Sequence, residues 1–142
     1  MRGLTITVCL LTILLTATSS HSALKITETD RIDDAYSACL DKSKGVTANM
    51  NNCSGDAISK MDKRMNQVYK ALMEKLPKPK QELLKNTQRK WLAWRTTEQD
   101  LSYALDPNEG GTLQSVSAGG FAYEMLKRRV QELERYLNEL EL

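Results

Sequence analysis

The chain has 142 residues, a formal net charge of +2, three cysteines and a single histidine. This length suits one domain built around one hydrophobic core. The nearly balanced charge gives no general attraction to nucleic acid, and one histidine leaves little room for metal or imidazole catalysis.

The N-terminal segment predicts a signal peptide over residues 1–22. A basic residue precedes the apolar residues 4–17, and a small polar run follows, with cleavage expected after Ser22 or Ala23. The alternative is a membrane anchor, but about 14 apolar residues are fewer than the roughly 20 that a spanning helix needs. We therefore expect a periplasmic or secreted protein with no membrane span after cleavage and a single domain over residues 23–142.

Two amphipathic helices are predicted in the first half of the mature chain. The first covers about residues 29–44, and Gly45 ends it. Thr47 is a plausible N-cap for the second helix. The second helix has apolar residues at steps of three and four, which predicts a buried face rather than a methionine-rich binding groove. These residues are Ile58, Met61, Met65, Val68, Leu72 and Leu76.

Two more helices are predicted in the second half. Pro79 suits the first position of a helix that reaches about Leu105, and residues 106–111 form a turn-rich loop. Thr112 could cap the last helix, with a possible interruption at Gly119-Gly120. No β-type alternation competes, so we predict an all-α, antiparallel bundle of three to four helices.

The remaining cysteines predict one structural disulfide. Cleavage of the signal peptide removes Cys9 and leaves Cys39 and Cys53, which an oxidising compartment would pair. A lipid anchor on Cys9 is not favoured, because most of the apolar segment follows it. The close spacing of a redox pair is absent, and a zinc site would lack histidine. We expect no metal and no cofactor.

Charge is unevenly distributed along the second half. Residues 74–95 carry an excess of about five positive charges, whereas residues 96–142 are acidic. Packing of two helices with oppositely charged borders explains this better than a nucleic-acid site, because export argues against nucleic acid.

One face of the third helix carries Gln88, Trp91 and Arg95. We expect Trp91 and Trp94 to anchor the core through their large apolar surfaces. A buried guanidinium on such a face needs a carboxylate or several carbonyls as partners, and an acid on the first or fourth helix is the candidate. Arg95 is then a polar clamp between helices, or alternatively a contact for an anion or a partner.

These residues stand in an order that resembles the LprI-type lysozyme-inhibitor domain family. The order is Cys39, Met50-x-x-Cys53, Met65-Asn66-Gln67-Val68-Tyr69, Gln88-x-x-Trp91-x-x-x-Arg95, Gly110-Gly111 and Arg129-x-x-x-Leu133. The resemblance covers about residues 36–137, although the second cysteine pair of many members is absent. It implies a protein that blocks lysozyme without chemistry of its own.

The resemblance leaves the partner surface open. From charge and expected exposure, the first candidates are Asp106 and Glu109 in the loop and Glu132 and Glu139 on the last helix. An adaptor or accessory module of an envelope complex is the alternative function. An enzyme is not favoured, because no nucleophile motif or phosphate-binding loop appears and we identify no catalytic residue.

Overall fold

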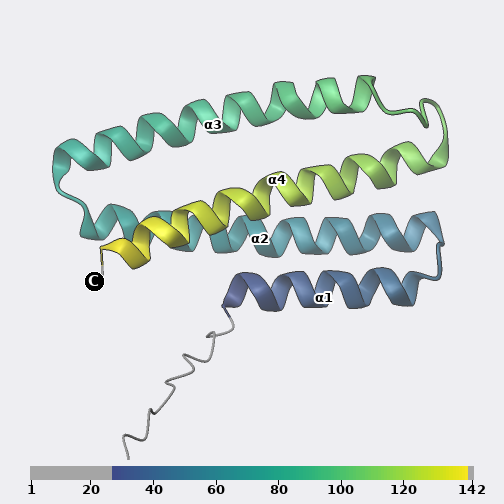
Figure 1. The fold of residues 1–142 in the computed structure, drawn as a ribbon, viewed down its shortest axis with the longest axis horizontal. Helices are drawn as coiled ribbons and strands as arrows, with labels where there is room; N and C mark the ends of the chain where they lie inside the picture. Colours follow the sequence, from purple (N-terminus) through teal and green to yellow (C-terminus); the bar gives the residue numbers. More distant parts are fainter. Residues whose placement is uncertain (1–26, 141–142) are drawn as a thin grey trace, which may run out of the picture.

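The computed structural model describes residues 27–140, and four α-helices make up most of this part (Figure 1). They are α1 (Glu28–Ser43), α2 (Thr47–Lys75), α3 (Lys78–Ala104) and α4 (Thr112–Glu139). No strand occurs within the described residues, so the all-α prediction is confirmed. The predicted signal peptide and Cys9 lie outside them.

Local contacts and backbone conformation define both ends of α1. Thr27 caps α1 by accepting a hydrogen bond from the Asp30 backbone N–H, and the return bond from the Thr27 backbone N–H lowers the pKa of Asp30. After α1, Lys44 and Gly45 both adopt positive φ, 50° and 76°, and glycine adopts such a backbone without strain. The predicted end of the helix is therefore confirmed.

Three details of the other helix ends differ from the predictions. Thr47 and Thr112 are the first helical residues rather than the caps, because the extended residues Val46 and Gly111 precede them. Pro79 is the second residue of α3, since Pro77 occupies the N-cap. Such shifts of one residue reflect caps without a side-chain hydrogen bond, which leave little signal in the sequence.

The core lies among α1, α2 and α4, and α2 and α4 pack along much of their length (Figure 1). The most deeply buried apolar side chains are Met61, Val68, Leu72, Tyr123, Leu126, Val130 and Leu133. The predicted interruption of α4 at Gly119-Gly120 is wrong. A Cβ at Gly119 would lie 3.0 Å from the Cβ of Ser54, so glycine permits a close approach to α2, and this packing outweighs its poor helix propensity.

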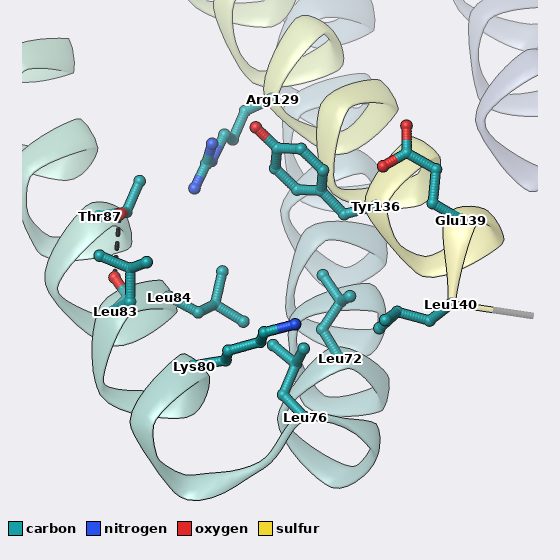
Figure 2. Close-up of a pocket in the computed structure, with 10 residues that line it drawn as sticks. All are labelled: Leu72, Leu76, Lys80, Leu83, Leu84, Thr87, Arg129, Tyr136, Glu139 and Leu140. Atoms are coloured by element: carbon teal, nitrogen blue, oxygen red, sulfur yellow. Dashed lines mark hydrogen bonds between the residues drawn. The ribbon is translucent and has the colours of Figure 1, made fainter.

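Helix α3 lies at the outer edge of the bundle, beyond α4 (Figure 1). Only Leu84 and Gln88 of this helix are buried. Leu84 approaches Leu72 of α2 where α3 begins, beside the C-terminal end of α4 (Figure 2). No helix within residues 27–140 combines the length and the apolar character that crossing a membrane requires.

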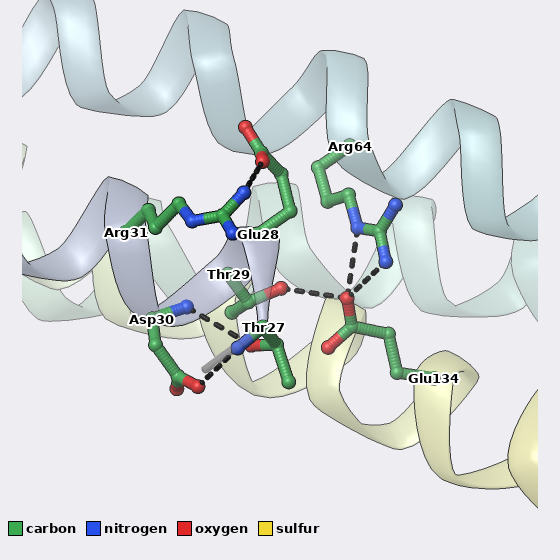
Figure 3. A network of polar contacts seen from close by, with 7 residues as sticks. All are labelled: Thr27, Glu28, Thr29, Asp30, Arg31, Arg64 and Glu134. Atoms are coloured by element: carbon green, nitrogen blue, oxygen red, sulfur yellow. Dashed lines mark hydrogen bonds and ion pairs between the residues drawn. The ribbon is translucent and has the colours of Figure 1, made fainter. Parts of the chain in front are cut away.

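One carboxylate oxygen joins three helices. Oε1 of Glu134 on α4 accepts a hydrogen bond from the Thr29 hydroxyl at 2.8 Å and from Arg64 Nε at 2.8 Å, with Arg64 Nη2 at 2.7 Å (Figure 3). Thr29 comes from α1 and Arg64 from α2. Because the Glu134 side chain is only 12% exposed, these donors replace water that it would otherwise hold. We call these three residues the Glu134 network.

A second polar contact joins α1 to α4. The Tyr123 hydroxyl donates to Asp33 Oδ1 at 2.9 Å, and Lys127 Nζ reaches the same oxygen at 3.0 Å. Burial raises the pKa of Tyr123, and the hydrogen bond to Asp33 adds to this effect. Burial alone would lower the pKa of Lys127, but hydrogen bonds to Glu124 and Asp33 outweigh it and raise the pKa.

The predicted disulfide is confirmed. Cys39 on α1 and Cys53 on α2 are bonded, with their Cα atoms 5.7 Å apart. Beside it, the Tyr36 and Ser54 hydroxyls share a hydrogen bond of 3.0 Å. The α1–α2 hairpin is therefore held by a covalent bond and a polar contact next to its turn.

Candidate functional site

Two motif residues of α3, Gln88 and Trp91, contact one buried arginine of α4. Arg129 is 4% exposed, and its Nε donates to Gln88 Oε1 at 3.0 Å. Gln88 Nε2 in turn donates to the sulfur of Met65 on α2 at 3.3 Å. Nη1 of Arg129 pairs with Glu132 on the same helix. This buried polar contact fixes α3 against the other helices.

Two guanidinium groups lie close to the Trp91 ring. Cζ of Arg95 is 5.3 Å from the ring centroid, and Cζ of Arg129 is 5.8 Å from it, within the range of cation–π attraction. The expected carboxylate partner of Arg95 is wrong: within the described residues it forms no ion pair, and its buried Nε has no hydrogen-bond partner. The Trp91 ring takes the place of the expected acid.

Trp94 does not anchor the core, contrary to the prediction. It is 51% exposed, whereas Trp91 packs against the core. Helix α3 touches its neighbours along a narrow strip, and Trp94 lies on the flank of that strip.

Arg129 carries the buried charge in place of Arg95. The sequence could have indicated that Arg129 is buried, because it lies on the apolar stripe of α4 among Leu126, Val130 and Leu133.

The four candidate acids lie at two ends of α4. Asp106 and Glu109 are in the loop before its N-terminus, whereas Glu132 and Glu139 are in its C-terminal part (Figure 1). Twenty residues of helix separate Thr112 from Glu132, which corresponds to about 30 Å. The structure therefore does not bring the two pairs together.

The two acids near the C-terminal end of α4 already have partners. Glu132 pairs with Arg129 and accepts a hydrogen bond from the Tyr136 hydroxyl at 3.0 Å. Glu139 is exposed and pairs with Arg135 one turn earlier, and this hydrogen bond raises the pKa of Arg135. The ion pairs that join helices within the described residues connect α4 with α1 and α2, and none joins the basic α3 to α4.

The loop between α3 and α4 is held by its own hydrogen bonds. Oδ1 of Asp106 accepts from the Asn108 backbone N–H at 2.7 Å, which lowers the pKa of Asp106. The buried Gln114 accepts from the Gly110 backbone N–H at 3.0 Å and donates to the Tyr103 carbonyl at 3.1 Å. These bonds tie the loop to the ends of both helices.

Large apolar side chains surround this loop and remain in solvent. We call residues 101–113 the α3–α4 tip. The exposed fractions are 53% for Leu101, 51% for Tyr103, 72% for Leu105 and 51% for Leu113. Glu109 is exposed beside them, so the tip combines apolar surface with negative charge. Large apolar side chains left in solvent offer contact area to a protein partner.

Within residues 27–140, no three His, Cys, Asp or Glu side chains lie close enough together to hold a metal ion. The cluster around Arg129 attaches α3 to the other helices, whereas the tip leaves apolar side chains exposed to solvent.

Comparison with known proteins identifies the family. The model of the family described as "Lysozyme inhibitor LprI" matches residues 39–133. The matched segment runs from the first disulfide cysteine to the last buried leucine of α4, and it includes the cluster around Arg129 and the α3–α4 tip. Searches of curated proteins and of solved structures give no match. The chain therefore belongs to the LprI lysozyme inhibitor family.

Proposed function

We propose that this protein binds a lysozyme and blocks its substrate cleft, with the α3–α4 tip as the contact surface. The family supports inhibition as the function. The observation that carries the choice of surface is the exposure of Leu101, Tyr103, Leu105 and Leu113 around a hydrogen-bonded loop. The protein then acts by occupying the cleft and uses no catalytic residue.

The tip suits insertion into a concave site for two physical reasons. Leucine and tyrosine side chains supply apolar contact area, which is where binding free energy concentrates in interfaces. The loop is already ordered by Asp106 and Gln114, so binding costs little conformational entropy. Glu109 adds a negative charge that favours approach to a basic enzyme.

We also infer that the protein is exported. The support is the sequence pattern of residues 1–22, with a short apolar segment followed by small polar residues. Export to the periplasm or beyond it would place the protein where lysozyme meets the cell wall. The disulfide between Cys39 and Cys53 is compatible with such an oxidising compartment.

Two variants of α3 test the surface. Leu105→Asp changes the most exposed leucine of the tip, and Leu83→Asp makes the same change near the other end, where the leucine is 67% exposed. The oxidised protein, recovered after export, is titrated into lysozymes of several classes while cell-wall lysis is followed. We expect Leu105→Asp to weaken inhibition at least tenfold, equivalent to about 1.4 kcal/mol, and Leu83→Asp to leave it unchanged.

Two other results would contradict the proposal. Equal inhibition by the wild type and Leu105→Asp would move the contact away from the tip. Glu139→Lys, at the opposite end of α4, then tests that end directly. Unchanged lysis by every lysozyme at micromolar inhibitor would reject inhibition itself and favour an adaptor of an envelope complex.

A further inference from the structure

A second site lies far from the tip, where α2 ends, α3 begins and α4 ends. A cavity of about 350 Å³ opens there between the three helices (Figure 2). Five leucines line it: Leu72, Leu76, Leu83, Leu84 and Leu140. This volume is at the small end of the range for pockets that bind small molecules, and its apolar wall suits a single aliphatic chain.

A buried cation with an unused donor borders this cavity. Arg129 is 4% exposed, and its buried Nη2 has no hydrogen-bond partner. Its guanidinium extends from α4 toward α3, between Tyr136 and Thr87 (Figure 2). Its other two nitrogens are occupied by Gln88 and Glu132. A buried donor without a partner is costly, so a ligand oxygen that reached Nη2 would gain a charge-assisted hydrogen bond.

The other polar groups of the wall are already engaged. The Thr87 hydroxyl donates to the Leu83 carbonyl at 2.9 Å, and the Tyr136 hydroxyl donates to Glu132 at 3.0 Å. Glu139 pairs with Arg135. Lys80 is an exposed residue whose ammonium end is directed toward Leu72, and it is the second cation of the wall (Figure 2). A sugar or a peptide would find few partners there, whereas an apolar chain with one terminal anion needs no more than these two cations.

We propose that this cavity binds a free fatty acid, with the aliphatic chain among the leucines and the carboxylate on Arg129. The site and the α3–α4 tip lie at opposite ends of α3, so ligand binding here is separate from the proposed contact with lysozyme. The two functions can therefore be lost independently.

The head group is tested first on the wild-type protein. Decanoate and its neutral counterpart decanol are titrated below their aggregation limits, and binding is followed by calorimetry. We expect one decanoate per chain, bound at least tenfold more tightly than decanol, because a carboxylate accepts a charge-assisted hydrogen bond from Nη2 whereas a hydroxyl accepts only a weaker one. Equal affinity for the two ligands, or no saturable decanoate binding, would overturn the proposal.

The position of the decanoate carboxylate is tested by the ratio of the affinity for decanoate to the affinity for decanol. Arg129→Gln should reduce the preference for decanoate about tenfold, whereas Lys80→Met should reduce it less. General damage to the fold would weaken both ligands together and leave the ratio unchanged. Loss of the preference in Lys80→Met alone would place the carboxylate at Lys80 and reject the assignment to Arg129. If Arg129→Gln does not fold, the wild-type preference together with Lys80→Met still decides the question.

The position of the aliphatic chain is tested with Leu83→Asp and Leu105→Asp. Leu83→Asp places a carboxylate in the wall and should weaken decanoate binding at least tenfold, while Leu105→Asp should leave it unchanged. The opposite pattern is expected for lysozyme inhibition, so failure of one proposal is distinguished from failure of the other. Decanoate binding that survives Leu83→Asp would reject this site. Sedimentation of the wild type as a dimer that Leu83→Asp dissociates would assign the leucines to a second copy of the chain instead.

Discussion

Helices α1, α2 and α4 form a densely connected unit, whereas α3 is attached to it along a narrow strip. The three-helix unit contains the disulfide, the Glu134 network and almost all of the deeply buried side chains. Helix α3 buries only Leu84 and Gln88 and leaves large apolar side chains in solvent. The stabilising contacts are therefore concentrated in α1, α2 and α4, whereas much of the exposed apolar surface belongs to α3.

Polar contacts have different roles in the two regions. In the three-helix unit they accompany a continuous apolar core. At α3 they replace much of it, because Gln88 and the Trp91 ring meet Arg129 where apolar packing is thin. Buried polar contacts are directional and contribute little net free energy. The cluster around Arg129 therefore fixes the position of α3 more than it stabilises the fold.

The largest expected effect comes from matched leucine truncations in the two regions. Leu126 of α4 is 1% exposed, so Leu126→Ala should lower the free energy of unfolding by about 2–5 kcal/mol. Leu101 of α3 is 53% exposed, and Leu101→Ala should change it by less than about 0.5 kcal/mol. Urea denaturation of the oxidised proteins measures both. Similar losses at the two positions would show that α3 belongs to the same cooperative core.

The disulfide gives the next largest effect. It closes a loop across a sequence separation of 14, and the double variant Cys39→Ser/Cys53→Ser should lose about 3 kcal/mol on the loop-entropy estimate. Denaturation of this variant is compared with that of the wild type, with and without reductant. Reductant should destabilise the wild type alone. A double variant as stable as the oxidised wild type would contradict the role assigned to the bridge.

The Glu134 network is expected to contribute less. Glu134→Gln removes the charge that faces the Arg64 guanidinium and should cost about 1–3 kcal/mol, since both side chains are mostly buried. The control is Glu139→Gln, which breaks the exposed pair with Arg135 and should leave the denaturation midpoint unchanged. Equal midpoint shifts in the two variants would mean that burial of the network adds nothing.

Tyr123 gives the three-helix unit a dependence on alkaline pH. Its pKa is raised in the folded protein, so its contribution is fully present below about pH 10 and is lost as pH rises, because only the unfolded chain releases the proton. At pH 11 the loss should reach about 1.4 kcal/mol. Subtraction of the Tyr123→Phe curve from the wild-type curve isolates this term from lysine titration. If the stability curves of the wild type and Tyr123→Phe stay parallel from pH 8 to 11, the prediction is contradicted.

The smallest effect is a local one at the α3–α4 tip. The pKa of Asp106 is lowered, so its hydrogen bond to the Asn108 N–H persists at pH values above the ordinary Asp pKa of 3.8 and is lost as pH falls through the lowered pKa. The amide resonance of Asn108 should titrate there, while amides of the buried core should not move at the same pH. A resonance that titrates at the ordinary value would argue against an ordered loop.

The sequence predicted the parts of the fold that follow from periodicity and covalent chemistry. The apolar stripe of α2, Gly45 at the end of α1 and the Cys39–Cys53 bond all appear as expected. The environment of α3 was not predictable in this way. Trp94 and Arg95 look like core residues because hydrophobicity and spacing do not reveal how wide the contact between two helices is.

The candidate site was predicted in part. The turn at residues 106–111 and the group of Gln88, Trp91 and Arg95 were visible in the sequence. That Arg129 completes the group, or that Asp106 bonds within its own loop, depends on pairings across the fold. The distance between the two pairs of acids required the length and direction of α4.

The exposed flank of α3 has a consequence for how such proteins diversify. Substitutions at positions such as Trp94, Leu101 and Leu105 affect side chains that are at least half exposed, so they carry a smaller penalty in folding than substitutions in the core. The sequence of this flank can therefore change while the disulfide-linked helices stay the same. A library randomised at these positions should yield mostly folded members, and measuring their inhibition of several lysozymes tests the proposed contact surface directly.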